Sequence, residues 1–252
     1  MAALDPNVFN PFVLLDPAVA PAASVALTAA SMAMAVLISR SFFKSYSFSG
    51  FGYLLGLPAG FVFLAASFAF ELASFSYSGY PVLHPAFFWV QLALQSEAFA
   101  LIALSYYYKN SSAGPRLGAR DVAMLLIPFA MVAVPFILPT SEIAGKPYFN
   151  YAQLADFSLY MRIFNMAVLG FIFKNAIFSL ARAGSIRMLY VPAAFALLWL
   201  EQYSLVMTYF DNSAFAFAGS MAARVGGLAL FAYAVHAVTK RKSVEIEAGK
   251  AA

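Results

Sequence analysis

Cysteine is absent from this 252-residue chain, and histidine occurs only twice, as His84 and His236. Without cysteine the protein has no disulfide, no thiolate metal site and no cysteine nucleophile. The two histidines lie near opposite ends of the helix bundle predicted below, so they cannot share one haem or one metal ion. The sequence also contains no HExxH, GxSxG or P-loop motif, and none of the Glu-x-x-His pairs typical of di-iron bundles. We therefore expect no metal, no bound cofactor and no enzymatic activity.

Charged residues are scarce as well. They make up 10% of the sequence, against 63% hydrophobic residues, whereas a soluble domain carries about 25% charged residues. This composition predicts an integral membrane protein in contact with the lipid bilayer. The formal net charge of +4 does not indicate binding to nucleic acid, because the basic residues are scattered between hydrophobic segments, where the positive-inside rule accounts for them.

Hydrophobic segments of membrane-spanning length recur along the chain. A membrane helix needs roughly 20 apolar residues, and seven segments approach that length, at residues 22–38, 51–75, 86–107, 122–138, 155–180, 188–210 and 215–238. We therefore predict an all-α fold, a polytopic bundle of seven transmembrane helices that forms a single domain over residues 1–242. Residues 1–20 are expected to form an extracytoplasmic N-terminal segment, and residues 243–252 a short polar cytoplasmic tail.

The distribution of Lys and Arg between the predicted helices sets the orientation. Basic residues follow the first, third, fifth and seventh segments, namely Arg40, Lys44, Lys109, Arg116, Arg120, Arg182, Arg187, Lys240, Arg241 and Lys242. The opposite side has Lys146 alone, together with Asp5, Asp16, Glu142, Asp156 and Asp211. By the positive-inside rule the N-terminus lies outside and the C-terminus lies in the cytoplasm. This pattern predicts a multi-pass protein of the plasma membrane.

Small residues recur at helical spacing in two of the segments. Gly56 and Gly60 form a GxxxG pattern in the second segment, and Gly219, Ala223, Gly226 and Gly227 form a similar stripe in the seventh. Small residues at this spacing let two helices approach closely. We expect ordinary close packing within the bundle, and a homodimer face is the alternative.

Five charged residues lie inside the hydrophobic segments. They are Glu71, Glu97, Arg162, Glu201 and Arg224. An ionised side chain at the bilayer centre costs at least roughly 2.5–3.5 kcal/mol, so each needs a compensating partner or a functional role. Small polar residues share a helical stripe with most of them, which turns these stripes toward the bundle interior. The stripes are Ser67-Glu71-Ser74, Arg162-Asn165, Glu201-Ser204-Thr208 and Ser220-Arg224.

The depth of these residues predicts a pocket that opens to the outer side. Glu71 and Arg162 lie in the outer third of their helices and would form its entrance. Glu97, Glu201 and Arg224 lie near the middle of the membrane and would form its floor. Further candidate lining residues are Gln91, Gln95, Asn165 and Tyr203. We also predict an ion pair between Glu201 and Arg224, because they lie at matched depth on consecutive helices.

The charge balance of the five residues leaves two interpretations open. Three carboxylates against two arginines leave one excess negative charge, which favours a proton- or cation-sensitive site. The alternative is a salt-bridge network that only fixes the registry of the helices. Glu97 is rotated by about 160° from Gln95 around its helix, so this helix is expected to be polar on two sides.

Three functions fit a protein of this kind. The first is a sensor or receptor-like protein with a buried charged pocket and a separate signalling partner, in the membrane or at the cytoplasmic face. The second is a non-catalytic auxiliary subunit of a larger membrane complex. The third is a proton-coupled carrier or channel. The oligomeric state does not follow from the sequence.

Overall fold

The computed structural model describes residues 20–49, 56–77, 83–110, 151–183, 189–211 and 214–251. These residues form six α-helices and no strand. The helices are α1 (Ala20–Ser49), α2 (Gly56–Ser76), α3 (Leu83–Asn110), α5 (Tyr151–Ala183), α6 (Tyr190–Asp211) and α7 (Ala214–Ala251). The predicted helix at residues 122–138 and the N-terminal segment up to residue 19 lie outside the described residues.

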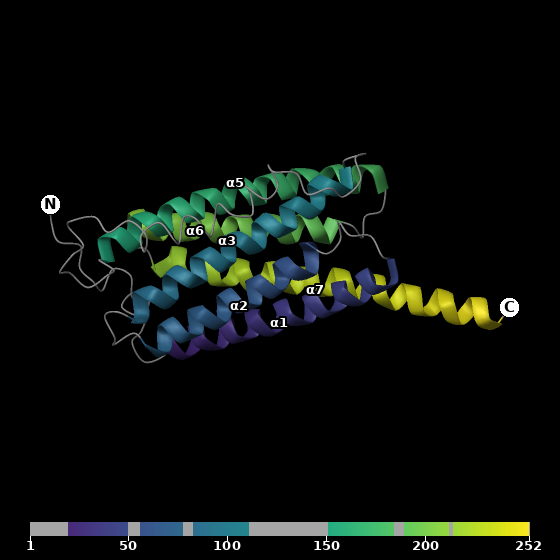
Figure 1. The fold of residues 1–252 in the computed structure, drawn as a ribbon, viewed down its shortest axis with the longest axis horizontal. Coiled ribbons are helices and arrows are strands. Elements are labelled where there is room, and N and C mark those ends of the chain that lie inside the picture. The colour runs from purple at the N-terminus through teal and green to yellow at the C-terminus, as the bar shows by residue number, and fades with distance from the viewer. Residues whose placement is uncertain are drawn as a thin grey trace.

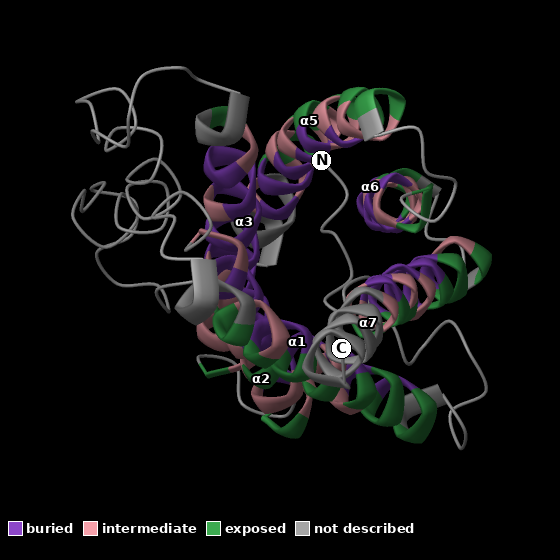
Figure 2. Ribbon diagram, turned by 90° about the vertical axis from the view of Figure 1, so that its right-hand side faces the viewer, coloured by how far each residue is buried: buried purple, intermediate pink, exposed green. Residues whose placement is uncertain are grey.

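The six helices pack into a closed ring. Each described helix contacts the next one along the chain, and α7 returns to contact α1, as the end-on view in Figure 2 shows. Five of the helices (α1, α2, α3, α5 and α7) are long and apolar enough to cross a membrane. The chain is therefore an all-α, multi-pass integral membrane protein. The remaining helix, α6, spans 22 residues and carries Glu201, Gln202 and Asp211, which reduce its hydrophobicity.

All six helices align along one axis, but their directions do not simply alternate. In Figure 1, α1, α3, α5 and α7 begin at one end of the bundle, and α2 and α6 end there. We call this the α2–α3 end, because α2 ends and α3 begins at it. Since α3 and α5 run in the same direction, residues 111–150 connect opposite ends of the bundle.

Two helices extend further than the hydrophobic segments predicted. The first segment was expected to end at residue 38, but α1 continues to Ser49. The last was expected to end at residue 238, with a polar tail from residue 243, but α7 continues to Ala251 and projects beyond the other helices (Figure 1). The extension is rich in Lys, Glu and Ala, which are good helix formers. Hydropathy identifies only the part of a helix that is apolar enough for lipid. It therefore underestimates the length of a helix that continues beyond the membrane into water.

Aromatic side chains fill the half of the bundle away from the α2–α3 end. The ring centroid of Phe231 lies 5.3 Å from that of Phe61 and 4.6 Å from that of Phe195. Tyr106 lies 5.8 Å from Phe195, also edge to face. We call these four residues, which come from α2, α3, α6 and α7, the aromatic plug. Phe61 and Phe195 are fully buried and Phe231 is 2% exposed.

The glycine stripes lie at close helix contacts inside the bundle. A β-carbon added at Gly60 would lie 2.6 Å from Ile102 Cγ1 and 2.8 Å from the carbonyl oxygen of Ala98. One added at Gly227 would lie 3.1 Å from the carbonyl oxygen of Ala194 on α6. The predicted close packing within the bundle is thus confirmed at Gly60. Its Cα packs against α3 and is not available for contact with a second copy of the chain.

Candidate functional site

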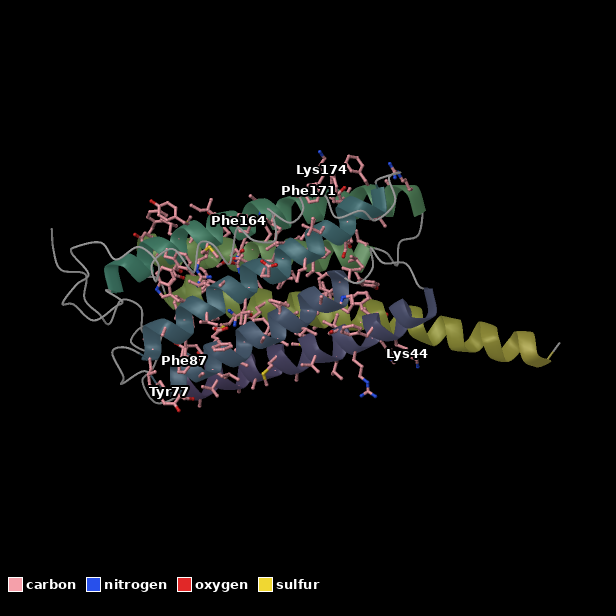
Figure 3. All side chains as sticks on the ribbon, viewed as in Figure 1. Lys44, Tyr77, Phe87, Phe164, Phe171 and Lys174 are labelled. Atoms are coloured by element: carbon pink, nitrogen blue, oxygen red, sulfur yellow. The ribbon has the colours of Figure 1, made fainter. Side chains whose placement is uncertain are left out.

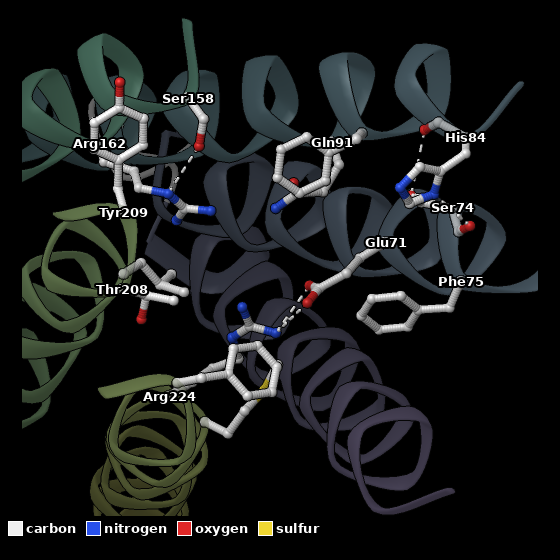
Figure 4. Close-up of a pocket in the computed structure, with 14 residues that line it drawn as sticks. Glu71, Ser74, Phe75, His84, Gln91, Ser158, Arg162, Thr208, Tyr209 and Arg224 are labelled. Carbon is white, nitrogen blue, oxygen red and sulfur yellow. Dashed lines mark hydrogen bonds and ion pairs between the residues drawn. The ribbon is translucent and has the colours of Figure 1, made fainter. Parts of the chain in front are cut away.

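Arg224 joins two glutamates in the interior of the ring. Its Nε donates a 2.7 Å hydrogen bond to Glu201 Oε1, and its Nη1 donates to Glu71 Oε1 at 3.0 Å and Oε2 at 2.8 Å. All three residues are at most 5% exposed. The predicted ion pair between Glu201 and Arg224 is confirmed, and Glu71 completes a buried triad (Figure 4 shows its Glu71–Arg224 half).

The Glu201–Arg224 contact follows from the short connection between α6 and α7, whereas the Glu71–Arg224 contact depends on how the helices close into a ring. Glu201 lies ten residues before the end of α6 at Asp211, and Arg224 lies ten residues after the start of α7 at Ala214. The short connection between these helices therefore places the two side chains at the same depth. Glu71 comes from α2, which is not a ring neighbour of α7, so this contact crosses the interior. Phe68, on the preceding turn of α2, places its ring centre 5.0 Å from Arg224 Cζ, which adds a cation–π contact.

A second arginine lies near the triad without joining it. Arg162, on α5, is 8% exposed, and its Nε donates a 3.0 Å hydrogen bond to Ser158 Oγ one turn earlier. Among the described residues no carboxylate oxygen lies within 4.0 Å of its nitrogens. The triad carries one excess negative charge when its members are ionised, so the four residues together are neutral.

A cavity of about 100 Å³ separates Arg162 from the triad at the α2–α3 end. One water needs roughly 10–15 Å³ on this measure, so the cavity has room for several waters or a small molecule. Five helices contribute to its wall, and Figure 4 shows how their side chains converge on it. Its polar lining residues are Glu71, Ser74, His84, Gln91, Ser158, Arg162, Thr208 and Arg224, and its apolar or aromatic ones are Phe75, Phe88, Leu205, Tyr209, Phe217 and Met221.

Four of the predicted pocket residues line this cavity, namely Glu71, Gln91, Arg162 and Arg224. Glu201 lies behind Arg224 and is bonded to it rather than to the cavity. Tyr203 is 40% exposed and stacks on Trp199 at 5.8 Å between ring centroids. Tyr203 does not line this cavity, because it is two residues from Glu201 and therefore points to the opposite side of α6.

Glu97 is also separate from the cavity. It is 3% exposed, and its Oε2 has no hydrogen-bond partner among the described residues. Its position on α3 is about 160° around the helix from Gln95, and it belongs neither to the triad nor to the cavity wall. The third carboxyl group expected at the pocket therefore lies on a different face of α3.

A layer of buried amides lies one helical turn below the cavity. Asn165 Nδ2 donates a 3.2 Å hydrogen bond to Gln202 Oε1. Asn165 Oδ1, Gln202 Nε2 and both side-chain polar atoms of Gln95 have no partner among the described residues, although all three side chains are fully buried. Buried polar atoms are normally hydrogen-bonded to protein or water, so polar character continues below the cavity floor.

Ser74 and His84 contact each other in the cavity wall, and the sequence did not predict this contact. His84 precedes the predicted segment at residues 86–107, but the structure places it in the first turn of α3, and its Nδ1 is 2.9 Å from both Ser74 Oγ and the Ser74 carbonyl oxygen. The next residue, Pro85, is compatible with this position, because proline is well tolerated in the first turn of a helix. Ser74 already shared a polar stripe with Glu71, which was the available signal.

No protein-family model, curated protein or solved structure matches this chain. Within the described part of the chain, no three His, Asp or Glu side chains come together as metal ligands.

Proposed function

We propose that this protein is a sensor or receptor-like protein of the plasma membrane, a bundle of seven transmembrane helices whose charged cavity opens to the outer side and binds a small ligand. The observation that carries the proposal is that the cavity is one-ended. Charged and polar side chains occupy the half of the interior near the α2–α3 end, and the aromatic plug occupies the other half.

The aromatic plug argues against the carrier or channel alternative. A transport path needs polar groups or water through the full thickness of the membrane. Around the aromatic plug, Ser39 and Ser105 are buried, and each hydroxyl is bonded to a backbone carbonyl. Phe61, Phe195 and Phe231 fill the interior there, so the described helices line no continuous polar route through this half of the bundle.

Helix directions support seven crossings. Because α3 ends and α5 begins at opposite ends of the bundle, the chain between them returns across its length, which is the role predicted for the segment at residues 122–138.

Exposed basic residues support the outward opening of the cavity. Arg40, Lys44, Lys174 and Arg182 all lie toward the end opposite the cavity, and Figure 3 shows Lys44 and Lys174 directed away from the bundle. By the positive-inside rule that end faces the cytoplasm.

A ligand in this cavity would join α5 to α2, α6 and α7, which the triad already connects. Glu71, Arg162 and Arg224 place groups from α2, α5 and α7 on its wall, and α6 adds Thr208. A ligand shifts a conformational equilibrium only through different contacts with the two states. Changes in how these helices meet would reach the opposite end along α7, whose extension to Ala251 offers a surface to a cytoplasmic or membrane partner.

Cysteine labelling tests the one-ended cavity on this cysteine-free chain. Met221 lines the cavity, and Leu228 lies seven residues further along the same face of α7 in the apolar core. In intact cells, a Met221→Cys variant should react with a small membrane-impermeant thiol reagent added outside. A matched Leu228→Cys variant should be protected.

Three outcomes would overturn the proposal. Protection of both cysteines would mean a dry registry network without a reachable pocket. Labelling of both would favour the channel or carrier. Purification of the protein with a partner in fixed stoichiometry, together with protection of Met221→Cys, would favour the auxiliary subunit.

A further inference from the structure

Arg162 has unused hydrogen-bonding capacity directed into the cavity. A guanidinium has five N–H donors, and Ser158 Oγ accepts from Nε alone. The two Nη atoms have no partner among the described residues, and Figure 4 shows this end of the side chain facing the space across from Arg224. Arg162 is only 8% exposed, and among the described residues no carboxylate contacts it, so its buried positive charge has no direct ion-pair partner there.

The two glutamates nearest to Arg162 are already occupied. Both oxygens of Glu71 accept from Arg224 Nη1, and Glu201 accepts from Arg224 Nε. A cationic ligand would therefore have to displace Arg224 from a pair of carboxylates. An anionic ligand needs no such displacement, because Arg162 is available to it.

We infer that Arg162 is an anion-binding group and that the cavity takes a small monocarboxylate with a short apolar body. This inference rests on the proposed function, since it requires a pocket that a ligand can enter from outside. The planar guanidinium matches a carboxylate with two parallel N–H donors. Gln91, which is 2% exposed and lines the same wall, offers an amide as a further donor.

The remaining lining restricts the rest of the ligand. Phe88, Leu205, Phe217 and Met221 give the cavity an apolar side, which suits a hydrocarbon or aromatic group. A volume of about 100 Å³ excludes a large molecule. A dianion such as a phosphate monoester would need a second free cation, and Arg224 is committed to two glutamates, so a single negative charge fits best.

Ligand binding to the full-length protein in lipid nanodiscs tests this inference. The probes are butyrate and benzoate, each compared with its neutral amide, butyramide or benzamide, by calorimetry and by the shift in thermal unfolding. The variants are Arg162→Gln and Gln91→Leu. Lys174→Gln is the matched control, because it removes a positive charge from an exposed position on the same helix.

At least one acid should bind to the wild-type protein and to Lys174→Gln, and its amide should bind roughly 10–100-fold more weakly, as expected for the loss of hydrogen bonds to a charged group. Arg162→Gln should lose a similar factor. If that variant does not fold, Gln91→Leu serves in its place with an expected loss of several-fold. Equal binding of acids and amides, full binding to both variants, or no binding by either acid would overturn the inference.

Failure of the ligand class can be distinguished from failure of the pocket. If Met221→Cys is labelled from outside but neither acid binds, the pocket stands and its ligand is not a monocarboxylate. If Met221→Cys is protected, the proposed function itself fails, and this inference fails with it.

Discussion

Replacement of Arg224 by methionine isolates the energetic role of the buried triad. The change removes three hydrogen bonds and leaves Glu71 and Glu201, which are 5% and 1% exposed, without their cation. Breaking a buried ion pair by removing one partner typically costs about 3–5 kcal/mol. That cost corresponds to roughly two to three and a half orders of magnitude in the ratio of folded to unfolded protein.

Removing all three charges together should cost less than removing one. In the triple variant Glu71→Gln, Glu201→Gln and Arg224→Met, no uncompensated charge stays buried, and replacement of a whole buried ion pair is often close to neutral. The contact of Arg224 with the ring of Phe68 is lost in both variants and is worth about 0.5–2 kcal/mol. The triple variant should therefore recover most, but not all, of the stability lost by Arg224→Met.

Reversible unfolding in mixed detergent micelles, followed by helical circular dichroism, measures these differences. Lys174→Met is the control, because it makes the same kind of substitution at an exposed position and should change the free energy of unfolding little. The reasoning is refuted if Arg224→Met is as stable as the wild type, or if the triple variant is less stable than Arg224→Met.

Two further predictions concern packing and orientation. Gly60→Leu should destabilise the bundle by about 1–3 kcal/mol, because its side chain would collide with α3. Gly170→Leu should not, since a β-carbon there meets nothing within 4 Å, and equal effects in unfolding experiments would count against the packing argument. A cysteine at Ser76 should be labelled from outside intact cells and one at Lys44 only after permeabilisation, and the reverse pattern would invert the orientation.

The Glu201–Arg224 pair could be predicted from the sequence because it depends on a local connection. Glu201 and Arg224 flank a short turn between consecutive helices, so counting residues to the turn was enough to pair them. Their third partner, Glu71, lies 153 positions before Arg224. Only the closure of the ring brings α2 opposite α7, and hydrophobic periodicity carries no information about that closure.

The predicted pocket included residues chosen by their depth in the membrane, although depth does not say in which direction a side chain points. Residue counts put Glu97 near the depth of Glu201 and Arg224, but a position 160° around α3 from Gln95 faces a different part of the protein. Tyr203 shares the depth of the amide layer and points away from it for the same reason. Depth follows from a single helix, whereas the direction of a side chain depends on which neighbours that helix has.

One face of α7 connects the two halves of the interior. Phe217, Met221 and Arg224 line the cavity on this face, and Leu228 and Phe231 continue it into the apolar core. Arg224 and Phe231 are seven residues apart, which is about 10.5 Å along the helix. A ligand bound at Arg162 that shifts α7 at Arg224 would therefore also move a ring that packs against Phe61 and Phe195. Because packed aromatic rings settle in discrete arrangements rather than deforming continuously, this face gives the proposed sensor a physical route from its cavity to the opposite end of the bundle.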